Sequence, residues 1–562
     1  MNNKITSHQK ILAAGLVTVV AGVAFLGVKL ATNTHQNAEG PRVAQKTAPA
    51  AREQAAAPRA DLAPLLAAAA QQDSEIAPLY ERSGYQPLWV NSRHLKEATA
   101  MSTAAEAQGI DTAKLAHLLL SANGHNMEAA EIARTDVALT KETLRLATAL
   151  RLGVVPTEKI GTYWVMQADT FDAVAGLSEA LDKNNLKAFV AGLQPKDPQY
   201  KALMTAFQTY RDMVEQGGWP QIAAGEEIDL EAGDPRIPAL QARLAAEGYV
   251  PSTGNADAVT LREAIKAFQT RNGLEPDGRI GKGTLAALNV TAADRLGQIA
   301  ANLERWRHTP HDRGERFIAV NTASTTLDLM KGDESTLRIK VVAGDKRHAT
   351  PVLSVKMTGV TLNPRWEIPP SIASKEILPK LQKNPNYLAD NNMVIVDGVE
   401  GDPHGQYVDW SQYTARSFPL RLRQRAGDDN SLGLMKFQMT NPHNIYLHDT
   451  PSRSFFAKYE RHLSHGCVRV DQPTTLAEHV LLQTPGWDAA KINEEIATGV
   501  TRTIGLKEPL PVFISYWTVF SENGQINFRN DIYNRDAPLA QALGVLPEVA
   551  RNTTPTTTLA AN

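Results

Sequence analysis

The chain has 562 residues, enough for several domains because one domain usually takes about 100–200 residues. A hydrophobic content of 43% and a charged content of 21% are those of a globular protein. The formal net charge of −2 argues against a dedicated nucleic-acid binder, which needs a basic face. The single cysteine excludes an intrachain disulfide and is either a small buried residue or a free reactive thiol.

The N-terminal residues 1–30 are predicted to reach a membrane. Lys4 and Lys10 precede an uncharged apolar run from Ile11 to Val28. That run exceeds the usual signal-peptide core of about 7–15 residues and approaches the roughly 20 that span a bilayer. No small-x-small cleavage site follows at once, so an uncleaved signal-anchor is favoured over a cleaved signal peptide. Residues 31–60 are rich in Ala, Pro, Gln and Thr, which predicts a disordered linker.

Residues 61–230 alternate Ala- and Leu-rich helical stretches with polar turns, which predicts a helical scaffold domain. An aromatic cluster of Tyr80, Tyr85 and Trp89 most simply anchors a small core. No nucleophile–base pairing occurs in this region, and we assign it no chemistry of its own.

Residues 233–290 predict three short helices joined by Gly-rich turns. Leu240 and Leu244, like Ile265 and Phe268, are spaced to share one helix face. The patterns Leu-Gln-x-Arg-Leu, Ala-x-x-x-Phe-Gln and Gly-Leu-x-x-Asp-Gly resemble the three-helix peptidoglycan-binding domain common on cell-wall enzymes. This domain either binds a ligand or has a purely structural role, and the sequence leaves both alternatives open.

Residues 314–500 are predicted to form a catalytic domain with a mixed β-sheet. Alternation and β-branched residues favour five strands, at 317–321, 326–330, 337–342, 435–439 and 445–448. A helix is predicted over 474–482. Residues 501–552 contain a further predicted strand, at 512–520, with a turn at Asn523-Gly524, and are expected to pack on the scaffold. Residues 553–562 are predicted to be a frayed tail.

Between these strands, residues 371–430 are polar and rich in Pro and Asp, with a short predicted helix near 372–378. We interpret them as an insertion that caps the active site, because a lid excludes water from a reactive intermediate. Four arginines most simply form a solvated face, with a grip on acidic wall peptides as the alternative: Arg416, Arg421, Arg423 and Arg425.

The stretch from His462 to Val470 contains the only cysteine, Cys467, with two histidines within five positions of it. A second cluster from Tyr446 to Pro451 lies one short loop upstream and contains His448. Imidazole can accept the thiol proton, and positive neighbours lower the pKa of a thiol. The two clusters together therefore predict an activated cysteine nucleophile.

The order Ser-His-Gly-Cys-Val-Arg, residues 464–469, with an upstream His-Asp-Thr-Pro resembles the active-site signature of the L,D-transpeptidases. The resemblance covers roughly Gly233 to Val519, and larger family members have a scaffold region ahead of the catalytic domain. It implies a multidomain α+β fold: a helical scaffold and a three-helix peptidoglycan-binding domain, plus a mixed β-sheet catalytic domain with a lid insertion.

The resemblance also implies the reaction. Such an enzyme takes a tetrapeptide stem as donor, forms an acyl-cysteine with release of D-alanine, and makes 3→3 peptidoglycan cross-links. Carbapenem-type β-lactams acylate members of the family, and no cofactor is expected. The expected place of work is the periplasm, with tethering to the inner membrane by the N-terminal segment.

By this resemblance Cys467 is the nucleophile and His448 the general base. From the residues alone, His448 and His465 remain alternatives because both can reach the sulfur, and His465 would otherwise shape the substrate or oxyanion side. Backbone N–H groups near Gly466 and Cys467 are the expected oxyanion hole. Asp449 is expected to orient the imidazole by its side chain or its backbone carbonyl.

Four further residues are predicted to contact substrate: Arg469, Ser464, Tyr446 and Trp366. A substrate carboxylate and a structural ion pair are the two alternatives for Arg469. Trp366 either lines a groove or packs at the rim of the β-fold.

Three other classes of function remain open, the first with two variants. The same cysteine with water as acceptor would make an L,D-carboxypeptidase, and with a protein lysine it would anchor proteins to the wall. A zinc site is the second alternative, because five candidate ligands lie close in sequence: His443, His448, His462, His465 and Cys467. The third is a non-catalytic wall-binding protein, against which the intact Cys467 and His448 argue.

Overall fold

The computed structural model describes residues 62–90, 92–123, 127–167, 169–397 and 401–545. The apolar N-terminal run, the linker and the C-terminal tail predicted above lie outside these residues. Among the helices that are described, none has both the length and the hydropathy of a bilayer span.

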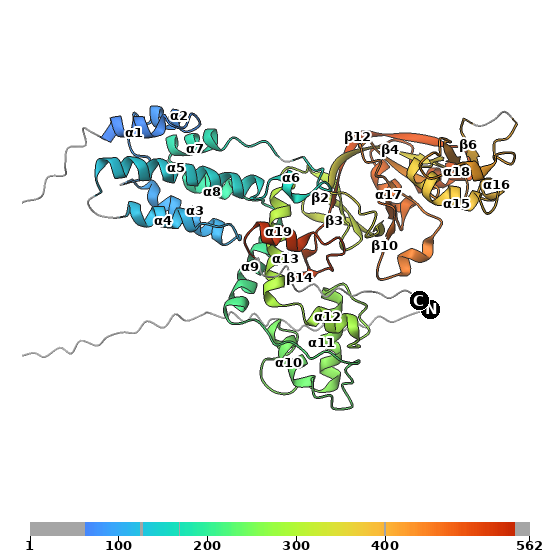
Figure 1. Cartoon of the computed structure of the whole chain (residues 1–562), viewed down its shortest axis with the longest axis horizontal. Helices are drawn as coiled ribbons and strands as arrows, with labels where there is room; N and C mark the ends of the chain where they lie inside the picture. Colours follow the sequence, from blue (N-terminus) through green and yellow to red (C-terminus); the bar gives the residue numbers. More distant parts are fainter. Residues whose placement is uncertain (1–61, 91, 124–126, 168, 398–400, 546–562) are drawn as a thin grey trace, which may run out of the picture. The chain divides into compact units, whose positions relative to one another are not determined.

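The scaffold region is helical, as predicted, and its core is organised around α5 (Figure 1). Asp136 on this helix is fully buried, and its carboxylate accepts the N–H groups of Leu88, Trp89 and Val90 at 2.8–2.9 Å. The hydroxyl of Tyr80 donates to the same carboxylate at 2.8 Å. The buried acid thus holds the aromatic turn in place, since a buried polar group needs hydrogen-bond partners. The helices are α1 (Leu62–Ala70), α2 (Ala77–Arg82), α3 (His94–Glu106), α4 (Ala113–Ala122), α5 (Ala129–Leu152), α6 (Thr157–Ile160), α7 (Ala173–Asp182), α8 (Leu186–Leu193) and α9 (Pro198–Glu215).

The predicted three-helix module is present as α10 (Ile237–Ala246), α11 (Ala258–Arg271) and α12 (Lys282–Leu288). Leu240, Leu244, Ile265 and Phe268 are buried in one core cluster, which confirms that each pair shares a face. Asp257 caps α11 by accepting the N–H of Thr260 at 2.8 Å. The helix therefore begins directly after this polar residue, where the apolar pattern starts.

A helix that the sequence reading did not predict, α13 (Ala292–Arg307), begins with a capping box between Thr291 and Asp294. The buried carboxylate of Glu304 accepts the N–H groups of Val154 and Val155 at 2.6 Å. One residue further on, Arg305 forms a buried ion pair with Asp536 at 2.6 Å. The helix α13 therefore joins the chain ahead of the catalytic domain to the segment that follows it.

Nine strands form the catalytic sheet, in the order β10-β3-β11-β9-β8-β4-β12-β1-β2. The strand β2 also pairs with β3, so the sheet closes on itself. Four predicted strands are confirmed as β1, β2, β3 and β8, and the predicted helix over 474–482 as α17. The strands are β1 (Arg316–Asn321), β2 (Thr326–Lys331), β3 (Glu334–Gly344), β4 (Leu353–Leu362), β8 (Met435–Met439), β9 (Leu447–His448), β10 (His462–Ser464), β11 (Val468–Val470) and β12 (Arg502–Ser515). Helices η4 (Arg453–Ala457), α17 (Pro473–Leu481) and α18 (Ala489–Ala497) belong to the same region.

The C-terminal segment differs from the prediction. The strand β12 runs side by side with β4 and pairs with β1 on its other edge, so it lies inside the catalytic sheet beyond the predicted boundary at residue 500 (Figure 1). The predicted strand at 512–520 is broken after Ser515, and its end begins a separate hairpin. That hairpin, β13 (Val519–Glu522) and β14 (Gln525–Phe528), turns at Asn523 and Gly524 with φ of 51° and 74°. The segment ends in α19 (Asp536–Ala542), which contacts α13.

The predicted capping insertion is a small folded unit with its own hydrophobic core. Ile377, Leu381, Leu388, Trp410 and Leu422 are among its buried residues. Three short strands pair in the order β5-β7-β6. The elements are β5 (Trp366–Glu367), α14 (Pro370–Ile372), the π-helical turn η2 (Ala373–Ile377), α15 (Leu378–Leu381), α16 (Tyr387–Asp390), β6 (Met393–Ile395), η3 (Trp410–Gln412) and β7 (Leu422–Gln424).

Candidate active site

Cys467 lies on the turn between β10 and β11, and hydrogen bonds within the turn fix its shape. Gly466 has φ of 112°, a conformation that a side chain disfavours. The hydroxyl of Ser464 accepts the N–H of Gly466 at 3.1 Å and donates to the carbonyl of Cys467 at 2.5 Å. Thr350 donates to the carbonyl of Gly466 at 2.8 Å. The hydroxyl of the buried Ser464 is thus used inside the turn, and a contact between Ser464 and substrate stays a prediction.

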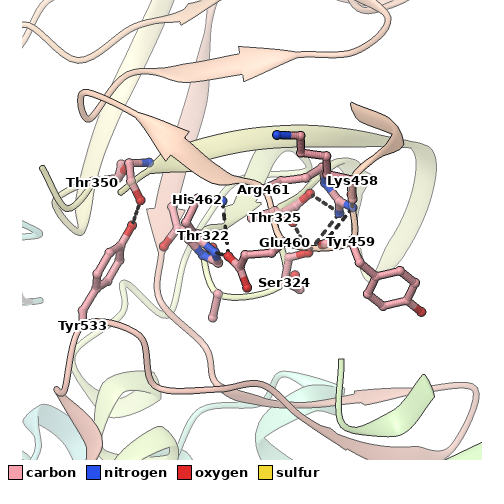
Figure 2. A network of polar contacts seen from close by, with 12 residues as sticks. Thr322, Ser324, Thr325, Thr350, Lys458, Tyr459, Glu460, Arg461, His462 and Tyr533 are labelled. Atoms are coloured by element: carbon pink, nitrogen blue, oxygen red, sulfur yellow. Dashed lines mark hydrogen bonds and ion pairs between the residues drawn. The ribbon is translucent and has the colours of Figure 1, made fainter. Parts of the chain in front are cut away.

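The strand before the cysteine is held by a polar network (Figure 2). The imidazole of His462 lies between the carboxylate of Glu460 and the carbonyl of Thr322, with 2.8 Å to the latter. Arg461 donates to the carbonyl of Thr325 at 3.2 Å. From the C-terminal segment, Tyr533 donates to the carbonyl of Gly344 at 2.6 Å. Both ring nitrogens of His462 therefore have partners within this network, which holds the strand in place.

The thiol of Cys467 is partly exposed and points toward the carbonyl of Asn444, with 3.6 Å between sulfur and oxygen. Desolvation by the surrounding protein raises the pKa of this thiol. A backbone hydrogen bond from Tyr446 and the charges of Lys436 and Arg469 act in the opposite direction and are outweighed. The positive neighbours do lower the thiol pKa, as expected. The net shift is nevertheless upward, because the effect of burial is larger. The resting thiol is protonated at neutral pH.

His448 is buried on β9, and the strand pairing places it beside Arg469, two residues after the cysteine. Its Nδ1 donates to the carbonyl of Asp449 at 2.5 Å. Burial first, and then the charge of Arg469, lower the pKa of this imidazole to about 3, so the ring is neutral. Since a carbonyl only accepts, the proton is on Nδ1 and the lone pair is on Nε2. Among the residues described, no hydrogen bond links His448 to Cys467.

Asp449 acts on His448 through its backbone. Its carboxylate accepts the N–H groups of Leu434 and Thr450 at 2.8 and 2.7 Å and pairs with Arg453. The side chain of Asp449 is therefore fully engaged elsewhere. Of the two ways in which the sequence allowed it to orient the imidazole, the structure has the carbonyl contact.

His465 is exposed and turns toward the capping insertion. Its Nε2 lies 3.0 Å from Oε1 of Glu376 on η2, and its ring lies 4.8 Å from the ring of His348. The N–H of Gly466 is taken by Ser464, whereas the N–H of Cys467 makes no hydrogen bond among the residues described. Of the two backbone groups expected in the oxyanion hole, that of Gly466 already has a hydrogen-bond partner, and the role of the Cys467 N–H stays a prediction.

Lys436 on β8 is a candidate that the sequence reading missed. Its Nζ lies 3.7 Å from the ring centre of Tyr446, and its charge acts on both Cys467 and His448. The alternation of the strand put Lys436 on the polar face, but only the strand pairing brings it beside the motif. Trp366 lies half-buried on β5 against the core of the capping insertion, which leaves both predicted roles open.

The five candidate zinc ligands all lie in the described part of the chain. In the described part of the chain, no three His, Cys, Asp or Glu side chains gather closely enough to hold an ion.

The two pKa shifts predict an unusual pH dependence for Cys467. Because its thiol pKa is raised and His448 is neutral, we expect its alkylation by iodoacetamide to keep accelerating above about pH 8.5, where ordinary thiols are half ionised. Intact-mass measurements over a pH series give this rate directly, because the chain has no other cysteine. A rate that is already constant below about pH 8 contradicts the prediction and indicates a preformed thiolate.

Comparison with known proteins assigns three regions. Residues 315–491 match the family model of the L,D-transpeptidase catalytic domain. Residues 233–288 match the "Putative peptidoglycan binding domain", and residues 74–207 match the model described as a scaffold domain.

A protein of Haemophilus influenzae named "Putative L,D-transpeptidase" is 36% identical over 239 residues, which cover 42% of this chain and 48% of that protein. The chain thus spans about half the length of this relative. A crystal structure of an L,D-transpeptidase from Xylanimonas cellulosilytica aligns at 16% identity with 53% of this chain and 98% of that one, with a TM-score of 0.15.

Proposed function

Because residues 315–491 of this chain belong to the L,D-transpeptidase catalytic-domain family, we propose that the protein forms 3→3 cross-links between peptidoglycan stems through an acyl-cysteine. The observation that carries the proposal is the partly exposed thiol of Cys467, on a glycine turn beside the strand of His448. A tetrapeptide stem is the donor, and its terminal D-alanine leaves.

The two half-reactions need one nucleophile and one proton carrier. In the first, the thiol proton moves to Nε2 of His448 while sulfur bonds to the donor carbonyl carbon; the C–N bond then breaks, and the leaving amine takes that proton. In the second, the acceptor amine bonds to the same carbon and the C–S bond breaks. A proton from the amine passes through His448 back to sulfur. The N–H of Cys467 donates to the carbonyl oxygen as charge develops on it.

The environment of His448 favours the second part of this proton transfer, the donation to the leaving amine. An imidazole whose pKa is lowered to about 3 is a weak base at rest but, once protonated, a strong acid toward a leaving amine. Attack and proton transfer are then concerted, since neither group is ionised beforehand. The acceptor decides the product, and an amine acceptor requires that water be kept out. We propose that the capping insertion does this, because Glu376 already reaches His465 beside the cysteine.

The region at 233–288 supports a wall substrate, since its family description names peptidoglycan binding. We propose on the same ground that the protein works outside the cytoplasm.

The test is product analysis with a disaccharide-tetrapeptide. We expect a 3→3 dimer and free D-alanine, with an acyl adduct on Cys467 in the intact-mass spectrum, and a covalent adduct on the same residue with a carbapenem. Tripeptide without dimer would identify an L,D-carboxypeptidase instead. Dimer formed with no adduct on Cys467 would overturn the acyl-cysteine route.

A further inference from the structure

Two cations flank His448 in one row across the catalytic sheet. Lys436 on β8 and Arg469 on β11 are the residues paired with His448 in the two neighbouring strands. Neighbouring strands lie about 4.8 Å apart, and residues directly opposite each other point to the same face of a sheet. The row therefore carries two positive side chains and one neutral imidazole on the face that also receives Cys467.

Among the residues described, no carboxylate lies within 4.0 Å of either cation, although the charge of Glu367 acts on Lys436 from further away. Lys436 lies over the ring of Tyr446, and the guanidinium of Arg469 lies 5.5 Å from the ring centre of Phe455. Nearby arginines are paired differently: Arg423 with Glu367 and Arg453 with Asp449. Both unpaired cations are only partly exposed, and burial lowers the pKa of each. Holding two desolvated cations together is unfavourable until an anion joins them.

The position of that anion relative to the reaction follows from the charges. Both cations act electrostatically on the sulfur of Cys467 and on the imidazole of His448. Because His448 lies between the two cations in the row, an anion that contacts both lies over His448 and next to the bond that breaks. In a peptide donor, the residue that leaves carries a free carboxylate only if the chain ends there. The carbon of that carboxylate is two bonds from the leaving nitrogen, which makes it the nearest anion beyond the broken amide.

We propose that Lys436 and Arg469 together bind the terminal carboxylate of the residue that leaves. The enzyme then selects donors that end one residue after the attacked carbonyl. This inference rests on the acyl transfer proposed above and names the feature of the donor that the site reads. Lys436 is its specificity-determining residue, and a longer stem places a neutral amide where the two cations require a charge.

The competing role for Lys436 is to stabilise the thiolate alone. That role does not depend on how the donor ends, so it affects every donor equally. Two tetrapeptide donors that differ only at the C-terminus, one a free acid and the other a carboxamide, therefore separate the two roles.

The experiment compares kcat/KM for the two donors in the full chain and in Lys436→Met. We expect the wild type to prefer the acid by about 10- to 100-fold, the range of a charge-assisted hydrogen bond. Lys436→Met should lose most of that preference, because it slows the acid donor far more than the amide donor. Lys436→Arg, which keeps the charge, should retain the preference. Lys356 is an exposed lysine on β4, and Lys356→Met is the matched control. This variant should leave the preference for the acid donor unchanged.

Equal slowing of both donors in Lys436→Met overturns the proposal in favour of thiolate stabilisation. A wild type that consumes acid and amide equally also overturns it, while leaving the acyl transfer intact. If Lys436→Met does not fold, as judged by its melting curve, loss of the acid preference in Arg469→Gln supports the paired site and retention overturns it. A wild type that consumes neither donor overturns the acyl transfer itself and this inference with it.

Discussion

Replacing Cys467 with alanine is expected to abolish cross-linking, with a fall in kcat of about ten-thousandfold or more, because no other group in the chain can form the thioester. The substitution removes one partly exposed sulfur atom and leaves the hydrogen bonds of Ser464 and Thr350 to the turn in place. The melting temperature should therefore change little. Muropeptide analysis by mass spectrometry measures the product. A thiol titration that finds no cysteine verifies that the protein assayed is the variant.

Residual 3→3 product from Cys467→Ala would remove the nucleophile assignment. The control is a variant of the same turn that keeps the thiol. Ser464→Ala loses two hydrogen bonds inside the turn, so it should weaken activity and yet still give an adduct on Cys467.

Replacing His448 with alanine is expected to slow acylation by about 100- to 10,000-fold, which is the usual contribution of a positioned general base. Because the imidazole is buried, the change also leaves a cavity, and His448→Gln is the better-packed companion variant. The rate of adduct formation at Cys467 measures the effect without needing an acceptor.

His465→Ala is the matched control for His448. This side chain is exposed and contacts Glu376 on the capping insertion, so its loss should alter acylation far less. If His465→Ala suppresses acylation while His448→Ala does not, the general base is His465. Both variants should fold. His465→Ala removes only a surface contact, and His448→Ala removes a single imidazole ring.

Local pattern predicted much of the fold. The strands β1, β2, β3 and β8 follow the alternation of their own residues, and α11 follows its apolar period and its cap at Asp257. The strand β12 did not stand out in its first part, because Pro509 and Pro511 argue against a strand inside a sheet. The structure accommodates Pro509 with a shift of register between Gly505 and Leu510, whereas Pro511 pairs in register with Lys356.

The helix α13 was missed for a different reason. Its buried face carries Glu304, Arg305 and Arg307, whose charges mask the apolar period. Only tertiary partners such as Asp536, distant in sequence, make their burial tolerable.

The candidate site divides in the same way. Two short motifs pointed to Cys467 and His448, because the proposed nucleophile and base lie in clusters only one loop apart in the sequence. The role of Lys436 depends on the pairing of β8 with β9, and the net shift of the thiol pKa depends on burial. Neither quantity can be derived from the order of residues around the cysteine.

The central place of β12 determines which fragments of this protein can be expected to fold. The range matched by the catalytic family ends at residue 491, whereas β12 begins at Arg502 between β4 and β1. A protein truncated to that range would have two unsatisfied strand edges in the middle of its sheet, which invites intermolecular pairing and insoluble aggregates. A soluble catalytic fragment therefore has to extend at least through Ser515.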